Sequence, residues 1–277
     1  MKLLINLIKP ASWLLLLALL GTALVSEAII IRHDVGSGDY LVSQVDYPAV
    51  FFLEQQGSRR VCVATVIHPR WAITAAHCSE ETMLGETVAQ GRRFGVTVAN
   101  RTREIDFVAT HPDYDQDSAT DVDLALLRFV KESAVPRPLP IYSERDEIGQ
   151  VARLLGWGFF GLGTTGRQYD DGRLRLAENR ISESARRLRL NFDDPRLPGS
   201  DSLALEGTLG LGDSGGPALI ESGTGLALAG VAIGELRDAS YSEETQGRYG
   251  AVAIFERISE HLDWIEAIVG RALPFDS

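Results

Sequence analysis

Cysteine, lysine and methionine are scarce in this 277-residue sequence. Its two cysteines, Cys62 and Cys78, allow at most one disulfide, which excludes a scaffold held together by many disulfides. Lysine occurs only at positions 2, 9 and 131. The 27 Lys and Arg residues are outnumbered by 38 Asp and Glu, giving a formal net charge of −11. Such an acidic surface argues against nucleic acid or an anionic membrane as a partner.

No metal or cofactor site is predicted. His77 has no second metal ligand at helical spacing. The acidic stretch that contains Asp113, Asp115 and Asp117 lacks the residue pattern of a calcium-binding loop. We therefore expect a protein that needs no cofactor.

Residues 1–28 have the composition of a secretory signal peptide. Lys2 and Lys9 supply a positive start, residues 11–25 are mostly apolar, and Ser26 and Ala28 place small residues where a signal peptidase cuts. The apolar run is short for a membrane span of roughly 20 residues, so a cleaved signal is favoured over a stable membrane anchor. We expect a secreted or periplasmic protein.

Export makes a disulfide between Cys62 and Cys78 chemically reasonable. Two buried thiols remain the alternative interpretation of this pair. The sequence alone leaves both open.

Beyond residue 28, the pattern is typical of β-strands until the C-terminal tail. Short apolar runs alternate with glycine, proline and aspartate, whereas residues 259–269 have the periodicity of an amphipathic helix that ends near Gly270. Many short strands and one terminal helix predict antiparallel barrels. Prolines 136, 138 and 140 mark the expected passage between two halves. The apolar runs are 49–53, 61–67, 72–74, 95–98, 124–130, 151–155 and 226–233.

The run Gly212-Asp213-Ser214-Gly215-Gly216-Pro217 is the most informative part of the sequence. Glycines around a serine favour a tight turn, which exposes the hydroxyl and directs backbone N–H groups at one point. We predict Ser214 as a nucleophile and the N–H groups of Gly212 and Ser214 as donors to an oxyanion.

Acyl transfer by a serine also needs a base and a carboxylate that orients the base. His77 follows an apolar run, and Asp123 begins another. Taken singly, the histidine, the aspartate and the serine fit a surface residue, a turn residue and a loop residue. Their joint occurrence in one order favours catalysis. The α/β-hydrolase order is not favoured, because the only histidine after Ser214 is His261, on the predicted terminal helix.

Together these motifs resemble those of the trypsin/chymotrypsin-like serine peptidases, over most of residues 29–270. Within that family, we expect a bacterial-type exported member. The matching motifs are Thr74-Ala75-Ala76-His77-Cys78, His111-Pro112-Asp113-Tyr114, Asp123-Leu124-Ala125-Leu126-Leu127 and Gly156-Trp157-Gly158.

The resemblance implies an all-β fold of two antiparallel six-stranded β-barrels with a C-terminal α-helix. The expected peptidase domain covers residues 29–277, with the first barrel at about 29–140, the second at about 141–257 and the helix at about 258–270. The resemblance also implies that His77, Asp123 and Ser214 meet in the cleft between the barrels, and that a Cys62–Cys78 disulfide pins the histidine loop.

Asp121 competes with Asp123 for the role of the orienting acid. Members of the family place this acid directly before the Leu-Ala-Leu-Leu run, which favours Asp123.

The expected specificity pocket departs from that of trypsin-like members. Thr208 lies six residues before Ser214, where those members carry an aspartate that pairs with a substrate Arg or Lys. Thr208 lacks that charge, Leu209 adds apolar bulk, and we expect Ala253 to face the same pocket. The resemblance therefore implies a preference for apolar or small uncharged side chains before the cut. The expected substrate-pairing edge strand contains Ala232, Ile233 and Gly234.

The start of the expected mature chain is also unusual. In the family, proteolysis frees an Ile-Val-Gly-Gly terminus whose ammonium pairs with the aspartate before the serine, here Asp213. This chain has no glycine pair, but cleavage after Ala28 would free Ile29. We predict that Ile29 pairs with Asp213. The alternatives are that Arg32 or His33 pairs with Asp213, or that a further cut occurs.

The sequence thus predicts an exported serine endopeptidase that acts on proteins or peptides through an acyl-enzyme. A proteinaceous inhibitor is a further expected partner. Two alternatives remain, a catalytically silent trypsin-like binding protein and an esterase that uses the same triad.

Overall fold

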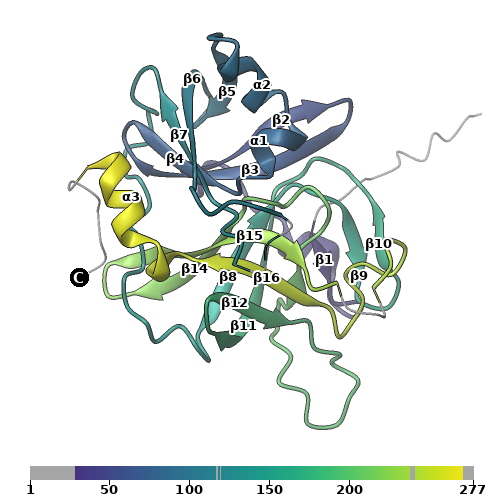
Figure 1. Ribbon diagram of the computed structural model, residues 1–277. Helices are drawn as coiled ribbons and strands as arrows, with labels where there is room; N and C mark the ends of the chain where they lie inside the picture. The colour runs from purple at the N-terminus through teal and green to yellow at the C-terminus, as the bar shows by residue number, and fades with distance from the viewer. Residues whose placement is uncertain (1–28, 117, 119, 238–240, 271–277) are drawn as a thin grey trace, which may run out of the picture.

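The computed structural model describes residues 29–270, apart from 117, 119 and 238–240. The predicted signal peptide lies outside these residues. Two packed β-structures account for most of the chain (Figure 1). The first is a six-stranded antiparallel sheet of order β2-β3-β4-β7-β6-β5, in which the end strands β2 and β5 contact each other. Its strands are β2 (Val50–Gln56), β3 (Arg59–His68), β4 (Trp71–Thr74), β5 (Phe94–Val98), β6 (Arg101–Thr110) and β7 (Ala125–Phe129).

The second structure is a closed six-stranded barrel of order β11-β12-β16-β15-β14-β8. This arrangement confirms the predicted all-β fold of two six-stranded barrels. Closure gives every strand of the second barrel two neighbours, and the end of one strand, after Val231, extends beyond its pairing on one side. Its strands are β8 (Val151–Gly156), β11 (Arg175–Ser184), β12 (Arg187–Asn191), β14 (Pro217–Ser222), β15 (Gly225–Glu235) and β16 (Val252–Arg257).

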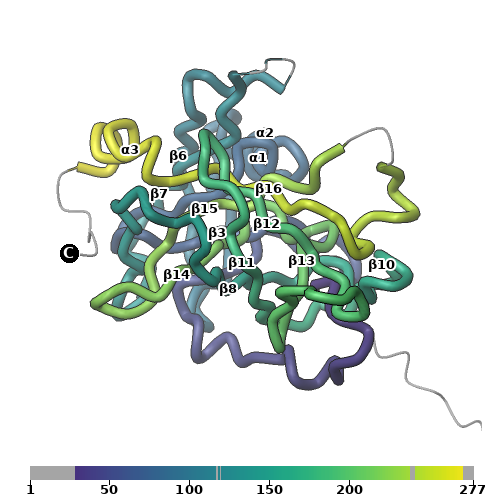
Figure 2. Tube along the Cα trace, turned by 90° about the horizontal axis from the view of Figure 1, so that it is seen from below, coloured from purple at the N-terminus to yellow at the C-terminus, as the bar shows by residue number. Residues whose placement is uncertain are grey.

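A small side sheet corrects the predicted start of the first barrel. Strand β1 (Ile30–Ile31) pairs with β13 (Gly207–Thr208) and with β9 (Phe160–Leu162), which in turn pairs with β10 (Gly166–Tyr169). Figure 2 shows the purple N-terminal segment beside β13. Residues 29–31 are fully buried. Burial of such an apolar run is favourable, and residues from the second half of the chain, which form the second barrel and the side sheet, bury it here. The segment after residue 29 therefore belongs with the second barrel, and the first barrel's strands begin at Val50.

Short helices occupy the connections and the end of the described chain. The predicted terminal helix is a 3₁₀ turn, η2 (Ile258–Glu260), followed by α3 (Leu262–Val269). Helix α3 packs back on the first barrel, where the Trp264 ring lies 4.8 Å from that of His111 (Figure 1). No helix in the described part of the chain has the length and apolar character needed to cross a membrane. The remaining helices are η1 (Ser37–Tyr40), α1 (Cys78–Glu81) and α2 (Leu84–Ala89).

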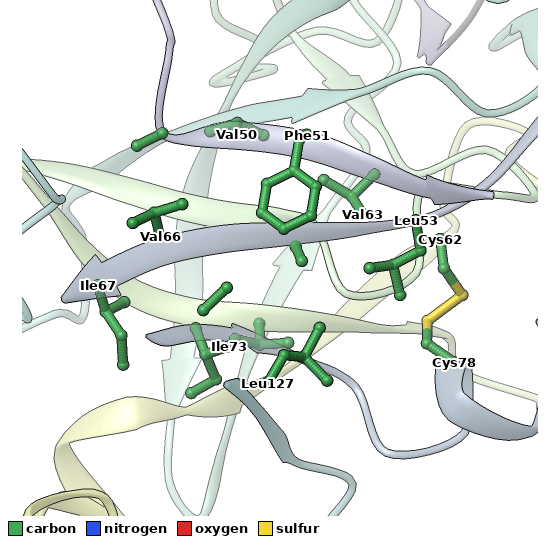
Figure 3. Close-up of a cluster of buried hydrophobic side chains, with 14 of the residues drawn as sticks. Val50, Phe51, Leu53, Cys62, Val63, Val66, Ile67, Ile73, Cys78 and Leu127 are labelled. Carbon is green, nitrogen blue, oxygen red and sulfur yellow. A yellow bond between two sulfur atoms is a disulfide. The ribbon is translucent and has the colours of Figure 1, made fainter. Parts of the chain in front are cut away.

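Strand β3 lies within the main buried cluster and leads to the segment that carries His77. Phe51, Val63 and Val66 pack in this cluster, and near the start of the strand Cys62 forms a disulfide with Cys78 (Figure 3). The disulfide implied by the family resemblance is confirmed. It ties β3 to the first residue of α1, directly after the histidine.

Removal of this disulfide should lower the free energy of unfolding by roughly 3 kcal/mol, because its sequence separation of 16 residues constrains the unfolded chain. The double variant Cys62→Ala/Cys78→Ala leaves no unpaired thiol, and urea unfolding measures the difference from the parent. A double variant as stable as the parent would contradict the prediction.

Candidate active site

The turn that carries Ser214 is fastened to the first barrel through its backbone. The N–H of Cys62 donates to the Gly212 carbonyl at 3.1 Å, and the N–H of Val63 donates to the Ser214 carbonyl at 2.7 Å. Gly212 has a φ of 103°, and a Cβ there would lie 2.9 Å from the Arg60 carbonyl oxygen. A side chain at position 212 would therefore be strained and crowded.

Backbone N–H groups within the turn divide into two sets. Those of Asp213 and Gly215 donate to the carbonyls of Gly210 and Ala232, at 3.1 and 2.7 Å. Those of Gly212 and Ser214 donate to no protein acceptor within the described ranges. These are the two amides predicted to stabilise an oxyanion, and only the Ser214 residue lines the cavity described below, while Gly212 is buried.

The imidazole of His77 is held by Asp123. Its Nδ1 lies 2.6 Å from Asp123 Oδ2, and the His77 backbone N–H donates to Asp123 Oδ1 at 2.9 Å. Burial opposes the charged imidazole, but the hydrogen bond and charge of Asp123 prevail, so the pKa of His77 is raised above its ordinary 6.5. Asp121 points elsewhere, with its carboxylate 2.7 Å from the Asp115 N–H and 3.4 Å from Arg187. Asp123 is therefore the acid that the fold brings to the histidine.

His77, Asp123 and Ser214 line one cavity of about 260 Å³. Ser214 Oγ and His77 Nε2 form no hydrogen bond in this structure. Such contacts are often long without substrate and tighten when it binds. The arrangement places a base and a nucleophile on the wall of one recess, which suits acyl transfer.

Only part of the predicted substrate-binding set reaches this cavity. Leu209, Ile233 and Gly234 lie on its wall, as predicted for pocket and edge-strand residues. Thr208, Ala232 and Ala253 are buried and do not line it. Their predicted contact with substrate is not supported by the lining of the cavity.

Ala253 pairs with Leu190 and Glu235 within the second barrel. Thr208 pairs with Ile30. Ala232 binds the serine turn through its own backbone, since its carbonyl accepts the Gly215 N–H. The backbone of each of these three residues thus pairs with a neighbouring segment of the protein rather than with the cavity.

Sequence reasoning missed the polar wall of the cavity. Glu235 follows Gly234 directly, so extending the predicted edge strand by one residue would have found it. No sequence motif identifies the others, because the cavity is assembled from separate loops. The missed lining residues are Glu81, Gln116, Gly210, Leu211, Glu235, Arg237, Tyr241 and Gln246.

Asp213 is fully buried below the turn, and its carboxylate accepts two backbone hydrogen bonds. Gly158 N–H donates at 2.6 Å and Gly210 N–H at 2.8 Å. A Cβ on Gly156 or Gly158 would collide with the Asp213 side chain, so both glycines are needed for the close approach. Burial raises the pKa of Asp213 to about 6, although these N–H groups and the charge of Arg175 act in the opposite direction.

The alternative partners for Asp213 bind other residues in this structure. Arg32 forms an ion pair with Asp34 at 2.7 Å, and His33 Nδ1 lies 2.7 Å from the Tyr249 hydroxyl. Ile29 is buried at the start of the side sheet, with its peptide chain continuing from residue 28. Its predicted pairing with Asp213 requires a free amino group and stays a prediction.

Comparisons with known proteins place the chain in a family. The profile of the trypsin family matches residues 39–265. Snake venom serine protease KN6 from Trimeresurus stejnegeri is 28% identical over 87% of this chain and 82% of its own length. Human granzyme M is 27% identical over 91% of each protein.

A solved structure also shares the fold. Neuropsin, a serine protease expressed in the limbic system of mouse brain, matches with a TM-score of 0.61 and 17% identity, over 83% of this chain and 98% of that one. The relatives named here come from animals, so they give no support to the bacterial-type assignment.

Replacement of Asp123 by Asn should reduce kcat for a peptide substrate about 10⁴-fold, because the amide would favour the wrong imidazole tautomer. In the parent, kcat/KM should fall as the pH drops through the raised pKa of His77, since the protonated imidazole cannot act as a base. The acid limb of the pH–rate profile should therefore lie above 6.5 and shift to lower pH in any residual activity of Asp123→Asn.

The control is Asp113→Asn, because the Asp113 side chain is 70% exposed and lies outside the cavity lining. This variant should match the parent. Full activity in Asp123→Asn would overturn the assignment of the orienting acid.

Proposed function

This chain belongs to the trypsin family and is a serine-type endopeptidase, and on that premise we propose that it cleaves proteins or peptides through His77, Asp123 and Ser214 after export. The observation that carries the proposal is the shared cavity, in which the His77–Asp123 pair lies beside a serine turn with two free amides.

In the proposed reaction, Asp123 accepts the Nδ1–H of His77 and leaves the Nε2 lone pair free. Nε2 removes the Ser214 Oγ proton as Oγ bonds to the substrate carbonyl carbon. The oxygen that becomes negative is bound by the N–H groups of Gly212 and Ser214. The imidazolium then protonates the leaving amine, and cleavage of the C–N bond gives an acyl-enzyme.

Hydrolysis of the acyl-enzyme repeats these steps with water. His77 deprotonates the water as its oxygen bonds to the acyl carbon, and Ser214 Oγ then leaves with the proton from the imidazolium. The carboxylic acid is released, and the enzyme returns to its starting protonation state.

We propose a preference for apolar or small uncharged side chains before the cut. The apolar wall residues Leu209 and Ile233 support this preference, as does a threonine at position 208. Gly234 at the end of β15 leaves room for a substrate main chain to pair with the strand edge. Glu235, also on the wall, accepts a hydrogen bond from Gly247 N–H at 2.9 Å and so has a partner within the protein.

Export is proposed from the sequence of residues 1–28, and snake venom proteases among the relatives support it. The expected compartment is extracellular or periplasmic, without a stable membrane anchor after cleavage. A proteinaceous inhibitor would compete with substrate for the same cleft.

We further propose that signal cleavage after Ala28 activates the enzyme by freeing the Ile29 ammonium to pair with Asp213. The position of β1 supports this, because Ile30 pairs with Thr208, two residues before the Gly210 amide that binds Asp213. An ammonium beside Asp213 would favour its ionised form, which burial alone disfavours.

Ser214→Ala should lower kcat about 10⁶-fold and abolish labelling by a fluorophosphonate, because no other group can form the acyl-enzyme. A diverse peptide library, read by mass spectrometry, should show cleavage after apolar or small uncharged residues. An unlabelled, inactive parent would contradict the function and favour a silent binding protein. Cleavage chiefly after Arg would contradict only the specificity.

A protein that begins at Ile29 should be active, whereas one that keeps Ala28 should lose at least 10-fold in kcat/KM, since an acylated Ile29 nitrogen carries no charge to offset that of buried Asp213. Intact-mass measurement establishes the N-terminus of each preparation. An inactive protein that starts at Ile29, alongside an active one with another start, would refute activation by signal cleavage.

A further inference from the structure

An Arg–Glu ion pair with a buried carboxylate lies in the second barrel, next to the turn that presents Asp123. Arg187 on β12 and Glu256 on β16 face each other in the strand ladder. Arg187 Nε and Nη2 lie 2.8 and 2.6 Å from Glu256 Oε1. The Glu256 side chain has no exposed surface, whereas that of Arg187 is 24% exposed. This pair therefore reaches from the barrel wall toward the interface between the barrels.

Both side chains bind the backbone of the turn that presents Asp123. The Asp123 N–H donates to Glu256 Oε1 at 3.2 Å, and Arg187 Nη2 donates to the Asp121 carbonyl at 2.9 Å. The two gripped peptide groups flank Val122. The pair thus clamps one turn of the first barrel from the second barrel.

The clamp has a role that the carboxylate of Asp123 cannot fill. Both of its oxygens already bind His77, so the side chain fixes the imidazole relative to Asp123 but not relative to Ser214. Within the first barrel, the turn is held by bonds from His111 N–H to the Leu124 carbonyl and from Val122 N–H to the Asp113 carbonyl. The clamp adds a direct connection to the barrel that carries Ser214.

We propose that Glu256 and Arg187 are positioning residues, which set Asp123 and hence His77 in register with Ser214 across the barrel interface. The proposal rests on the function proposed above for the three residues. A displacement of about 1 Å in a catalytic group can cost about 100-fold in rate, so such a clamp has a measurable kinetic effect.

The charge state of Glu256 suits this task. Burial opposes its ionisation, but His261, Arg187 and the Asp123 N–H together lower the pKa of Glu256 below its ordinary value. Arg187 and the Asp123 N–H bind Oε1, whereas His261 Nε2 lies 3.8 Å from Oε2, beyond hydrogen-bond distance. A buried ion pair often adds little net stability, which leaves registry of the two barrels as its main contribution.

The decisive variants are Glu256→Ala and Glu256→Gln in the enzyme from which residues 1–28 have been removed. Glu256→Ala should lower kcat about 10- to 100-fold with KM within about 3-fold of the parent. The reason is that displacement of Asp123 and His77 affects the reacting groups and not the substrate subsites. Glu256→Gln keeps an oxygen that can accept the Asp123 N–H and should recover most of the loss. Rates are expressed per active site titrated with a fluorophosphonate, and thermal unfolding is measured in parallel.

The chain supplies a matched control in a second buried pair of the same barrel. Glu147 is fully buried and binds Arg257 at 2.8 and 2.6 Å, but neither residue bonds to the turn 121–123. Glu147→Ala should lower the melting temperature to a similar extent, with kcat per titrated site within about 2-fold of the parent. Where Glu256→Ala does not fold, Arg187→Met tests the clamp from its more exposed end. This variant should lose about 5- to 30-fold in kcat for the same reason.

Several results distinguish the positioning role of Glu256 and Arg187 from the proposed function. An unchanged kcat in Glu256→Ala and Arg187→Met, or an equal loss in Glu147→Ala, would overturn the positioning role and leave the proposed function intact. A failure of Glu256→Gln to recover activity would also count against it. A parent enzyme without Ser214-dependent turnover would instead refute the proposed function.

Discussion

Two backbone hydrogen bonds across the barrel interface hold the turn that carries Ser214 against the first barrel. They run from the Cys62 and Val63 amides to the carbonyls of Gly212 and Ser214. The same strand, β3, carries the disulfide that fixes the segment after His77. One strand therefore sets the position of both the nucleophile and the base, and the neighbouring glycines exist because the backbones approach so closely.

Three buried carboxylates surround this junction, and each has different partners. Asp123 binds the backbone and ring of His77, Asp213 binds two backbone amides, and Glu256 binds Arg187 and the Asp123 amide. Burial of a carboxylate is costly unless such partners are present. Burial raises the pKa of Asp213 to about 6, although two backbone amides and the charge of Arg175 act in the opposite direction.

The predictions that succeeded rest on local motifs. Those that failed depend on which distant strands pair with each other. The two-barrel architecture and the Cys62–Cys78 disulfide are confirmed, and the fold brings Asp123 rather than Asp121 to His77. The N-terminal segment was wrongly placed in the first barrel, because a short apolar run contains no information about which distant strands will cover it. Ala253 was likewise expected on the pocket wall but lies against neighbouring strands.

The amino-acid sequence by itself determined the chemistry that this protein can perform, since a serine between glycines and a histidine beside a cysteine are short, local patterns. The tertiary structure alone decided which polar groups surround that chemistry. Gln116 and Gln246 on the cavity wall, and the clamp formed by Arg187 and Glu256, bring together segments far apart in the chain. Such contacts arise only when barrel closure brings specific strands into register, and no local pattern specifies that register.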